Sequence, residues 1–103
     1  VAQRVQERWA ALVDRDFEKA WEYTQPAFRA MVPQKEYRNH FGSGGQWLKA
    51  EVYRVSCEAE RCQVTLNLTT RVLVPPFAGQ EMTGAYDEVW IRDEGEWWYY
   101  QPL

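Results

Sequence analysis

Histidine, cysteine and excess positive charge are scarce in this sequence, and each shortage excludes a class of function. One His and two Cys in 103 residues cannot supply the four ligands of a closed zinc site. The 12 basic residues are outnumbered by 15 acidic ones, which gives a formal net charge of −3. A nucleic-acid-binding protein normally carries the opposite balance. We therefore expect no metal centre and no nucleic-acid partner.

Long apolar runs, low-complexity tracts and phosphate-binding loops are also missing. No apolar run approaches the ~20 residues that span a bilayer, so this segment is not expected to insert into a membrane. Apolar residues make up 46% of the chain, which argues against intrinsic disorder. The glycine-rich segment 42–45 lacks the Lys of a P-loop, and no cofactor is expected. The length predicts a single domain over residues 1–103.

The chain is instead rich in aromatic residues, with six Trp, six Tyr and four Phe, and its first half has helical periodicity. Val5, Trp9, Leu12 and Val13 recur at the 3.6-residue period of one helix face. Asp16 stands at the N-cap position of a second, short helix. The apolar face of that helix consists of Phe17, Ala20 and Trp21.

Two prolines mark further helix boundaries. The second helix is expected to end before Pro26, because the residue before a proline resists helical geometry. A third short helix is expected to begin near Pro33, a favoured first-turn residue, and to end at Gly42. It carries Tyr37, His40 and Phe41. Segment 42–45 then predicts a flexible break within the domain.

Beyond residue 46 the apolar period changes from 3.6 to 2, which predicts β-strands. The expected strands cover residues 47–57, 62–74, 82–92 and 96–101. A three-residue loop joins the last two, with Gly95 in the left-handed conformation that glycine tolerates best. Together these elements predict an α+β fold with N-terminal helices on one face of a four-stranded antiparallel sheet.

The two cysteines flank the first expected hairpin. A four-residue turn, 58–61, sets Cys57 opposite Cys62, where a disulfide is feasible. The alternative is two reduced thiols that pack at a strand end. A disulfide indicates an oxidising compartment such as the periplasm or the cell exterior. Because the chain begins with Val1, we expect a mature or trimmed segment that has lost an export signal or a lipid anchor.

The same turns fix a trial register for the sheet. The expected partners are Val55 with Val64, Tyr53 with Leu66, Glu51 with Leu68, Arg92 with Glu96, Ile91 with Trp97 and Val89 with Tyr99. In this register the apolar residues that face the helices are Val55, Val64, Leu66, Leu68, Val72, Val89, Ile91, Trp97 and Tyr99.

Polar residues gather at one end of this expected inner face: Glu51, Tyr53, Asp87 and Gln101. Glu51 and Asp87 would lie roughly 10 Å apart, a gap that suits a small ligand with one carboxylate acting as acid or base. The alternative is a set of ordinary solvated charges where the sheet outruns the helices. His40, the single histidine, is a candidate general base; the alternative is a cation at a helix C-terminus.

Four large aromatics fall on the opposite, otherwise polar face: Tyr86, Trp90, Trp98 and Tyr100. Tyr and Trp are enriched in interfaces because each has one apolar and one polar end. We interpret this face as a homodimer surface. The alternative is an aromatic ladder that stiffens two neighbouring strands.

Two segments, ERWAALVDRDFEKAWEYTQPAFR and VWIRDEGEWWYY, resemble the nuclear transport factor 2-like (cystatin-like) superfamily. The first gives a long helix, an aspartate-led short helix and a proline, and the second a terminal hairpin. The resemblance covers nearly the whole chain. It implies a cone-shaped fold with a curved sheet, a pocket between helices and sheet, and dimerisation through the sheet. The implied pocket residues are Trp21, Tyr37, Tyr53, Trp97, Tyr99 and Gln101.

These observations favour an exported, non-catalytic binding or accessory domain that dimerises and holds a small apolar or amphipathic molecule. A second hypothesis is a small isomerase, dehydratase or hydrolase that uses Asp87 or Glu51 with His40 or Tyr53. A third is a structural module through which a larger exported assembly dimerises. A hollow interior would favour the first two hypotheses, which need a ligand cavity, over the third.

Overall fold

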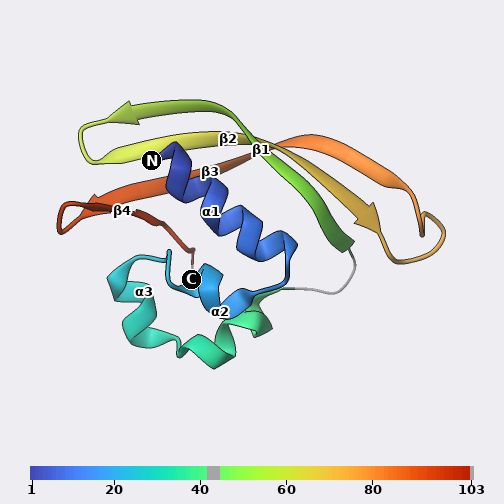
Figure 1. Cartoon of the computed structure of the whole chain (residues 1–103), viewed down its shortest axis with the longest axis horizontal. Coiled ribbons are helices and arrows are strands. Elements are labelled where there is room, and N and C mark those ends of the chain that lie inside the picture. Colours follow the sequence, from blue (N-terminus) through green and yellow to red (C-terminus); the bar gives the residue numbers. More distant parts are fainter. Residues whose placement is uncertain (42–44, 103) are drawn as a thin grey trace.

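A computed structural model describes residues 1–41 and 45–102, which form a layer of short helices against one face of a curved antiparallel sheet (Figure 1). The helical elements of this described part are α1 (Ala2–Val13), α2 (Phe17–Trp21), α3 (Pro26–Met31) and the 3₁₀ helix η1 (Gln34–His40). The strands are β1 (Gly45–Glu58), β2 (Arg61–Val72), β3 (Glu81–Asp93) and β4 (Glu96–Tyr99), in the order β1-β2-β3-β4. The predicted α+β class is confirmed. No helix of the described residues is long and apolar enough to cross a membrane.

The helical boundaries follow the local sequence signals closely. The Asp16 side chain accepts a hydrogen bond from the backbone N–H of Lys19 at 3.2 Å, so its predicted N-cap role is confirmed. Pro26 does not only follow α2; it also opens α3, as a proline in the first turn of a helix commonly does. Pro33 caps η1, close to where the third helix was expected. Residues 42–44 of the predicted glycine break lie outside the described residues.

The β1–β2 hairpin keeps the predicted register only near its turn. Cys57 lies opposite Cys62 in a disulfide, and Val55 lies opposite Val64, as expected. Beyond that point the register shifts at Tyr53, so the strand gains one residue relative to its partner. Each β-bulge reverses the face on which later side chains lie. Glu51 is therefore opposite Asn67 on the outer face, and its predicted inner position is wrong.

The β3–β4 hairpin differs from the prediction by one residue. Its loop has two residues, Glu94 at φ 55° and Gly95 at φ 78°, and both φ values are positive, as in a type I′ turn. Asp93, not Arg92, therefore pairs with Glu96. The shorter loop turns β3 over relative to the prediction. Its inner face carries Tyr86, Glu88 and Trp90, and its outer face carries Asp87, Val89 and Ile91.

The core lies between the helices and the sheet, and β4 joins the two layers. The backbone N–H of Tyr99 donates to the carbonyl of Tyr23, and its own carbonyl accepts from the N–H of Gln25. Along α1, Val5, Trp9 and Leu12 are buried as the helical period predicts. The other buried apolar residues are Ala11, Phe17, Ala20, Phe28, Tyr37, Cys62, Val64, Leu66, Trp90 and Tyr99.

Candidate functional site

A charged network occupies the centre of the core. Arg8 on α1 and Glu88 on β3 form an ion pair with 3.3 Å between Nη1 and Oε2, and their side chains are 3% and 1% exposed. The Glu88 carboxylate also accepts hydrogen bonds from the indole N–H of Trp9 at 3.2 Å and of Trp90 at 3.0 Å. Three N–H donors therefore compensate the burial of one carboxylate.

The Arg8 guanidinium extends the network toward η1 and the C-terminal segment. Its Nη2 donates to the Tyr37 hydroxyl, which donates in turn to the Gln101 side chain at 2.8 Å. The guanidinium carbon lies 3.6 Å from the ring centre of Tyr99, a close cation–π contact. Burial alone would lower the pKa of Arg8, but Glu88 and the two tyrosines raise it above its usual value, so the side chain stays charged. Burial also raises the pKa of Tyr99, against the opposing effect of Arg8.

The buried network stabilises the core and is closed to a substrate. Among the described residues, Nε of Arg8 is the one fully buried side-chain nitrogen or oxygen without a hydrogen-bond partner. Both charged groups are almost completely removed from solvent, so a substrate could reach them only if the core opened. We therefore assign the network a structural role, and the candidate ligand sites lie on the surface.

A groove on the surface combines positive charge with aromatic rings. It has a volume of about 410 Å³, and α1, α2, α3 and β4 all contribute to it. Its lining residues are Arg4, Lys19, Trp21, Glu22, Tyr23, Arg29 and Trp98; we call it the arginine–tryptophan groove. With three basic residues and one acidic residue, its lining is positive although the whole chain is acidic.

Two arginines stack on the same indole in this groove. The guanidinium carbons of Arg4 and Arg29 lie 4.9 Å and 4.6 Å from the ring centre of Trp98. Arg4 is also 4.9 Å from the ring centre of Tyr23, and Arg29 is 5.8 Å from that of Trp21. The rings and the cations therefore alternate along the groove.

Hydrogen bonds to the backbone hold these side chains in place. The indole N–H groups of Trp21 and Trp98 donate to the carbonyls of Val32 and Asp93, at 2.7 Å and 3.1 Å. Nε of Arg29 donates to the carbonyl of Thr24 at 3.0 Å, which leaves its terminal nitrogens available.

The groove's cations differ in how far they are neutralised. Arg4 forms a salt bridge with Glu96 at 3.5 Å, whereas Lys19 and Arg29 have no ion-pair partner among residues 1–41 and 45–102. Two positive groups of the groove are therefore free to meet an anion.

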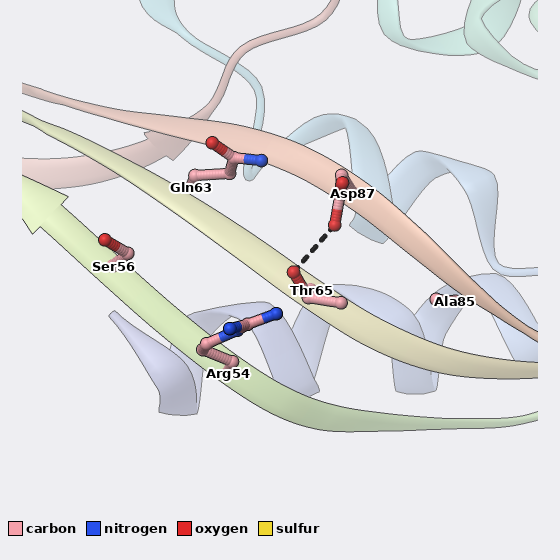
Figure 2. A pocket seen from close by; sticks show the side chains of 6 residues that line it. All are labelled: Arg54, Ser56, Gln63, Thr65, Ala85 and Asp87. Atoms are coloured by element: carbon pink, nitrogen blue, oxygen red, sulfur yellow. Dashed lines mark hydrogen bonds between the residues drawn. The ribbon is translucent and has the colours of Figure 1, made fainter.

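A second depression lies on the outer face of the sheet (Figure 2). It has a volume of about 370 Å³ and is lined by Arg54, Ser56, Gln63, Thr65, Ala85 and Asp87. The Thr65 hydroxyl donates to the Asp87 carboxylate at 2.7 Å across the neighbouring strands. Asp87 therefore lies on the face away from the helices, and its predicted position inside the cone is wrong because β3 is turned over.

The three candidate catalytic residues do not come together. Asp87 and Glu51 lie on the outer face, where Glu51 is 3.3 Å from the exposed Lys49 ammonium. His40 lies at the end of η1 in the helical layer, with its ring against Phe28.

The six predicted pocket residues do not line one cavity. Tyr37 and Tyr99 contact Arg8 in the core, and Gln101 accepts a hydrogen bond from Tyr37, whereas Tyr53 is 66% exposed at the β1 bulge. Trp97 is half-buried against the core, and only Trp21 belongs to the groove described above.

The four aromatics of the predicted dimer surface do not share a face. Trp90 is fully buried under the helices, so its assignment to an exposed surface is wrong. Tyr86 lies on the inner face with its ring 5.9 Å from that of Trp9, and Trp98 lines the groove. Tyr100 is 48% exposed. The one-residue difference in the β3–β4 loop accounts for the displacement of Trp90 and Tyr86.

Sequence reasoning missed Arg8, Glu88, Arg4 and Arg29. A signal for the first pair was present: Arg8 falls within the apolar stripe of α1, between Val5 and Leu12, where a buried cation requires a carboxylate partner. No comparable signal marks the groove arginines, because they are far apart in the sequence. Within the described residues, no cluster of three His, Cys, Asp or Glu side chains could hold a metal ion.

Comparisons with known proteins give the fold but no family. The sequence matches no protein-family model and no curated protein. Its fold is similar to that of a SEC-C motif containing protein from Rhodopseudomonas palustris, with a TM-score of 0.70 and 20% identity over 95% of this chain and 73% of that one. It is also similar to a SEC-C motif containing protein from Psychrobacter arcticus, with a TM-score of 0.65 and 16% identity over 92% of this chain and 55% of that one.

These neighbours correct the superfamily resemblance that the sequence suggested. Both are described as SEC-C motif containing proteins, a different family, so the assignment to the nuclear transport factor 2-like superfamily is wrong. The two segments that carried it, residues 7–29 and 89–100, fall in the helices α1 to α3 and in the β3–β4 hairpin. At identities of 20% and 16%, the likeness extends to the fold alone.

Proposed function

We propose that this domain is a non-catalytic binding module that works outside the cytoplasm. Its ligand is a small amphipathic molecule in which a planar ring carries an anionic group. The observation that carries the proposal is the stacking of Arg4 and Arg29 on Trp98 within the arginine–tryptophan groove. The groove's volume of about 410 Å³ falls in the range of small-molecule sites, roughly 300–1,000 Å³.

The groove offers each part of such a ligand a matching surface. A planar ring can pack against the half-buried rings of Trp21, Tyr23 and Trp98 and the guanidinium groups stacked on them, and an anionic group can pair with Arg29 and Lys19. Because the indoles and Arg29 are already hydrogen-bonded to the backbone, binding costs little side-chain ordering.

The Cys57–Cys62 disulfide supports a location outside the reducing cytoplasm. We assign the domain to the periplasm or the cell exterior. The separation of Asp87 and Glu51 from His40 supports binding without catalysis, since acid–base work requires groups within reach of one substrate.

Calorimetric titration with naphthoate, a planar ring with one carboxylate, tests the proposal. The wild-type protein is expected to bind naphthoate more tightly than its neutral methyl ester or the non-aromatic cyclohexanecarboxylate. Arg29→Gln is expected to weaken binding about tenfold or more, since it removes a charge-assisted hydrogen bond.

Arg54→Gln is the matched control, because Arg54 lies on the opposite face of the sheet. It should leave the affinity unchanged. Equal effects of Arg29→Gln and Arg54→Gln, or equal affinity for naphthoate and its methyl ester, would contradict the proposal.

A further inference from the structure

The sheet has one edge that is left open over much of its length. β2 pairs with β3 from Glu81 to Ile91, but β4 pairs with β3 only from Trp90 to Asp93. One more bond follows, from the N–H of Tyr100 to the carbonyl of Val89. No strand of the described chain covers the remaining edge, residues 81–88, which we call the open β3 edge.

The direction of its backbone groups follows from that last bond. The carbonyl of Val89 points toward β4, and in an antiparallel ladder every second residue points its N–H and C=O to the same side. The β2–β3 register runs without a shift, so Asp87, Ala85 and Thr83 share the orientation of Val89. Their N–H and C=O groups therefore form a row directed away from β2.

This edge lacks several of the features that commonly prevent edge pairing. Residues 81–88 contain no Lys and no Pro, and β3 has no bulge. β1, the opposite edge strand, has register shifts at Leu48 and Tyr53 and carries the exposed Lys49. The contrast between the two edges singles out β3 as the one suited to pairing.

The side chains on the two faces of the open β3 edge differ in chemistry. On the inner face, Met82 and Tyr86 are 63% and 40% exposed. Gly84 lies between them, and a Cβ at this position would meet nothing within 4 Å, so an apolar side chain of a partner could enter there. On the outer face, the Asp87 carboxylate accepts a hydrogen bond from Thr65 and forms no salt bridge among the described residues.

Charge indicates which partner fits. Residues 81–96 contain six acidic side chains and a single basic one, Arg92. Glu81, Glu88 and Glu96 are paired with arginines of other elements, which leaves Asp87, Asp93 and Glu94 without an ion-pair partner among the described residues. The whole chain is also acidic, with a formal charge of −3. A second copy would bring two acidic hairpins together, whereas a basic segment would be attracted to this edge.

We infer that the open β3 edge binds an extended basic peptide segment as a fifth strand of the sheet. Main-chain hydrogen bonds to Thr83, Ala85 and Asp87 supply the affinity. Specificity comes from an alternating pattern, with apolar side chains at Gly84 and basic side chains near Asp87. The inference does not depend on the arginine–tryptophan groove, which lies elsewhere.

A synthetic peptide of alternating Val and Lys tests the inference, with a Val–Glu peptide of equal length as its control. The Val–Lys peptide is expected to slow hydrogen exchange at the amides of Thr83, Ala85 and Asp87. Ala85→Pro removes the Ala85 N–H, which points away from β2, and so leaves the hydrogen bonds between β2 and β3 in place. Proline is tolerated at such edge positions. This variant is expected to weaken binding about tenfold.

If Ala85→Pro does not fold, a second Val–Lys peptide tests the same hydrogen bonds. Its backbone amides that would face β3 are N-methylated, so they cannot donate to the β3 carbonyls. Its expected result is loss of the protection. Protection at β1 amides, equal binding of the Val–Glu peptide, or concentration-dependent protection of these amides without peptide would each overturn the inference. The last result would identify a second copy as the occupant.

Discussion

At the scale of single residues, the structure depends on a charged pair that the apolar pattern of the sequence conceals. Arg8 and Glu88 are almost completely buried, and the indoles of Trp9 and Trp90 complete the partners of the carboxylate. Removing one member of a buried pair leaves the other charge uncompensated, which costs more than the pair itself contributes. The stability of the fold should therefore depend strongly on both residues.

Neighbouring carboxylates on β3 give the sharpest test of this role. Glu88→Gln is expected to lower the free energy of unfolding by about 3 kcal/mol, because it leaves Arg8 buried without an anion. Asp87→Asn should lower it by less than about 1 kcal/mol, since it alters only an exposed hydrogen bond to Thr65. Urea denaturation of both variants measures the difference. The reverse order of effects would support the sequence-predicted face of β3 and contradict the structure.

Tyr99 makes the same core sensitive to alkaline pH. Burial raises the pKa of its hydroxyl above the usual value of 10.0, against the lowering effect of Arg8. A pKa that is higher in the folded state contributes stability that is complete below pH 10.0 and is lost as the pH rises toward the folded-state value. Above pH 10.0, this hydroxyl should therefore lower the unfolding free energy of the wild-type protein by about 1.4 kcal/mol per pH unit. Tyr99→Phe should remove that part of the decline. Tyr100→Phe, which removes an exposed hydroxyl, is the control, and equal effects of the two variants would refute the assignment.

At the scale of elements, the sequence predicts element types and order better than strand faces. The helical period of α1, the Asp16 cap and the Cys57–Cys62 hairpin all depend on short-range signals, and the structure contains each of them. Strand faces depend on counting residues through loops and bulges. The shift at Tyr53 and the two-residue loop before Glu96 each change that count by one, and no pattern in the sequence marks either change.

The tight β3–β4 turn gives a prediction at this scale. Gly95 has a φ of 78°, a conformation that a side chain strains, so Gly95→Ala should lower the free energy of unfolding by about 1 kcal/mol. Gly84→Ala should change it by less than about 0.5 kcal/mol, because Gly84 has open space around its Cβ position. Thermal unfolding of both variants makes the comparison. A larger effect at Gly84 than at Gly95 would contradict the two-residue turn.

At the scale of the whole molecule, the binding surfaces arise where distant segments meet. The arginine–tryptophan groove joins α1, α2, α3 and β4, so no local motif could have predicted it. Tyr37, Tyr99 and Gln101, which the sequence assigned to an interior pocket, belong to the buried network around Arg8 and Glu88. The SEC-C motif containing neighbours share this architecture and leave the function of the groove to be tested directly.

Heteronuclear NMR of the labelled protein during titration with naphthoate tests the central claim most directly, because each Trp indole N–H gives its own signal. We predict that the Trp21 and Trp98 indole signals shift first and saturate together, while those of the buried Trp9 and Trp90 stay in place. Arg29→Gln should move the midpoint of these shifts to a ligand concentration about tenfold higher. Shifts that begin at Trp9 and Trp90, or a midpoint that Arg29→Gln leaves unchanged, would place the ligand inside the core or elsewhere on the surface and contradict the account.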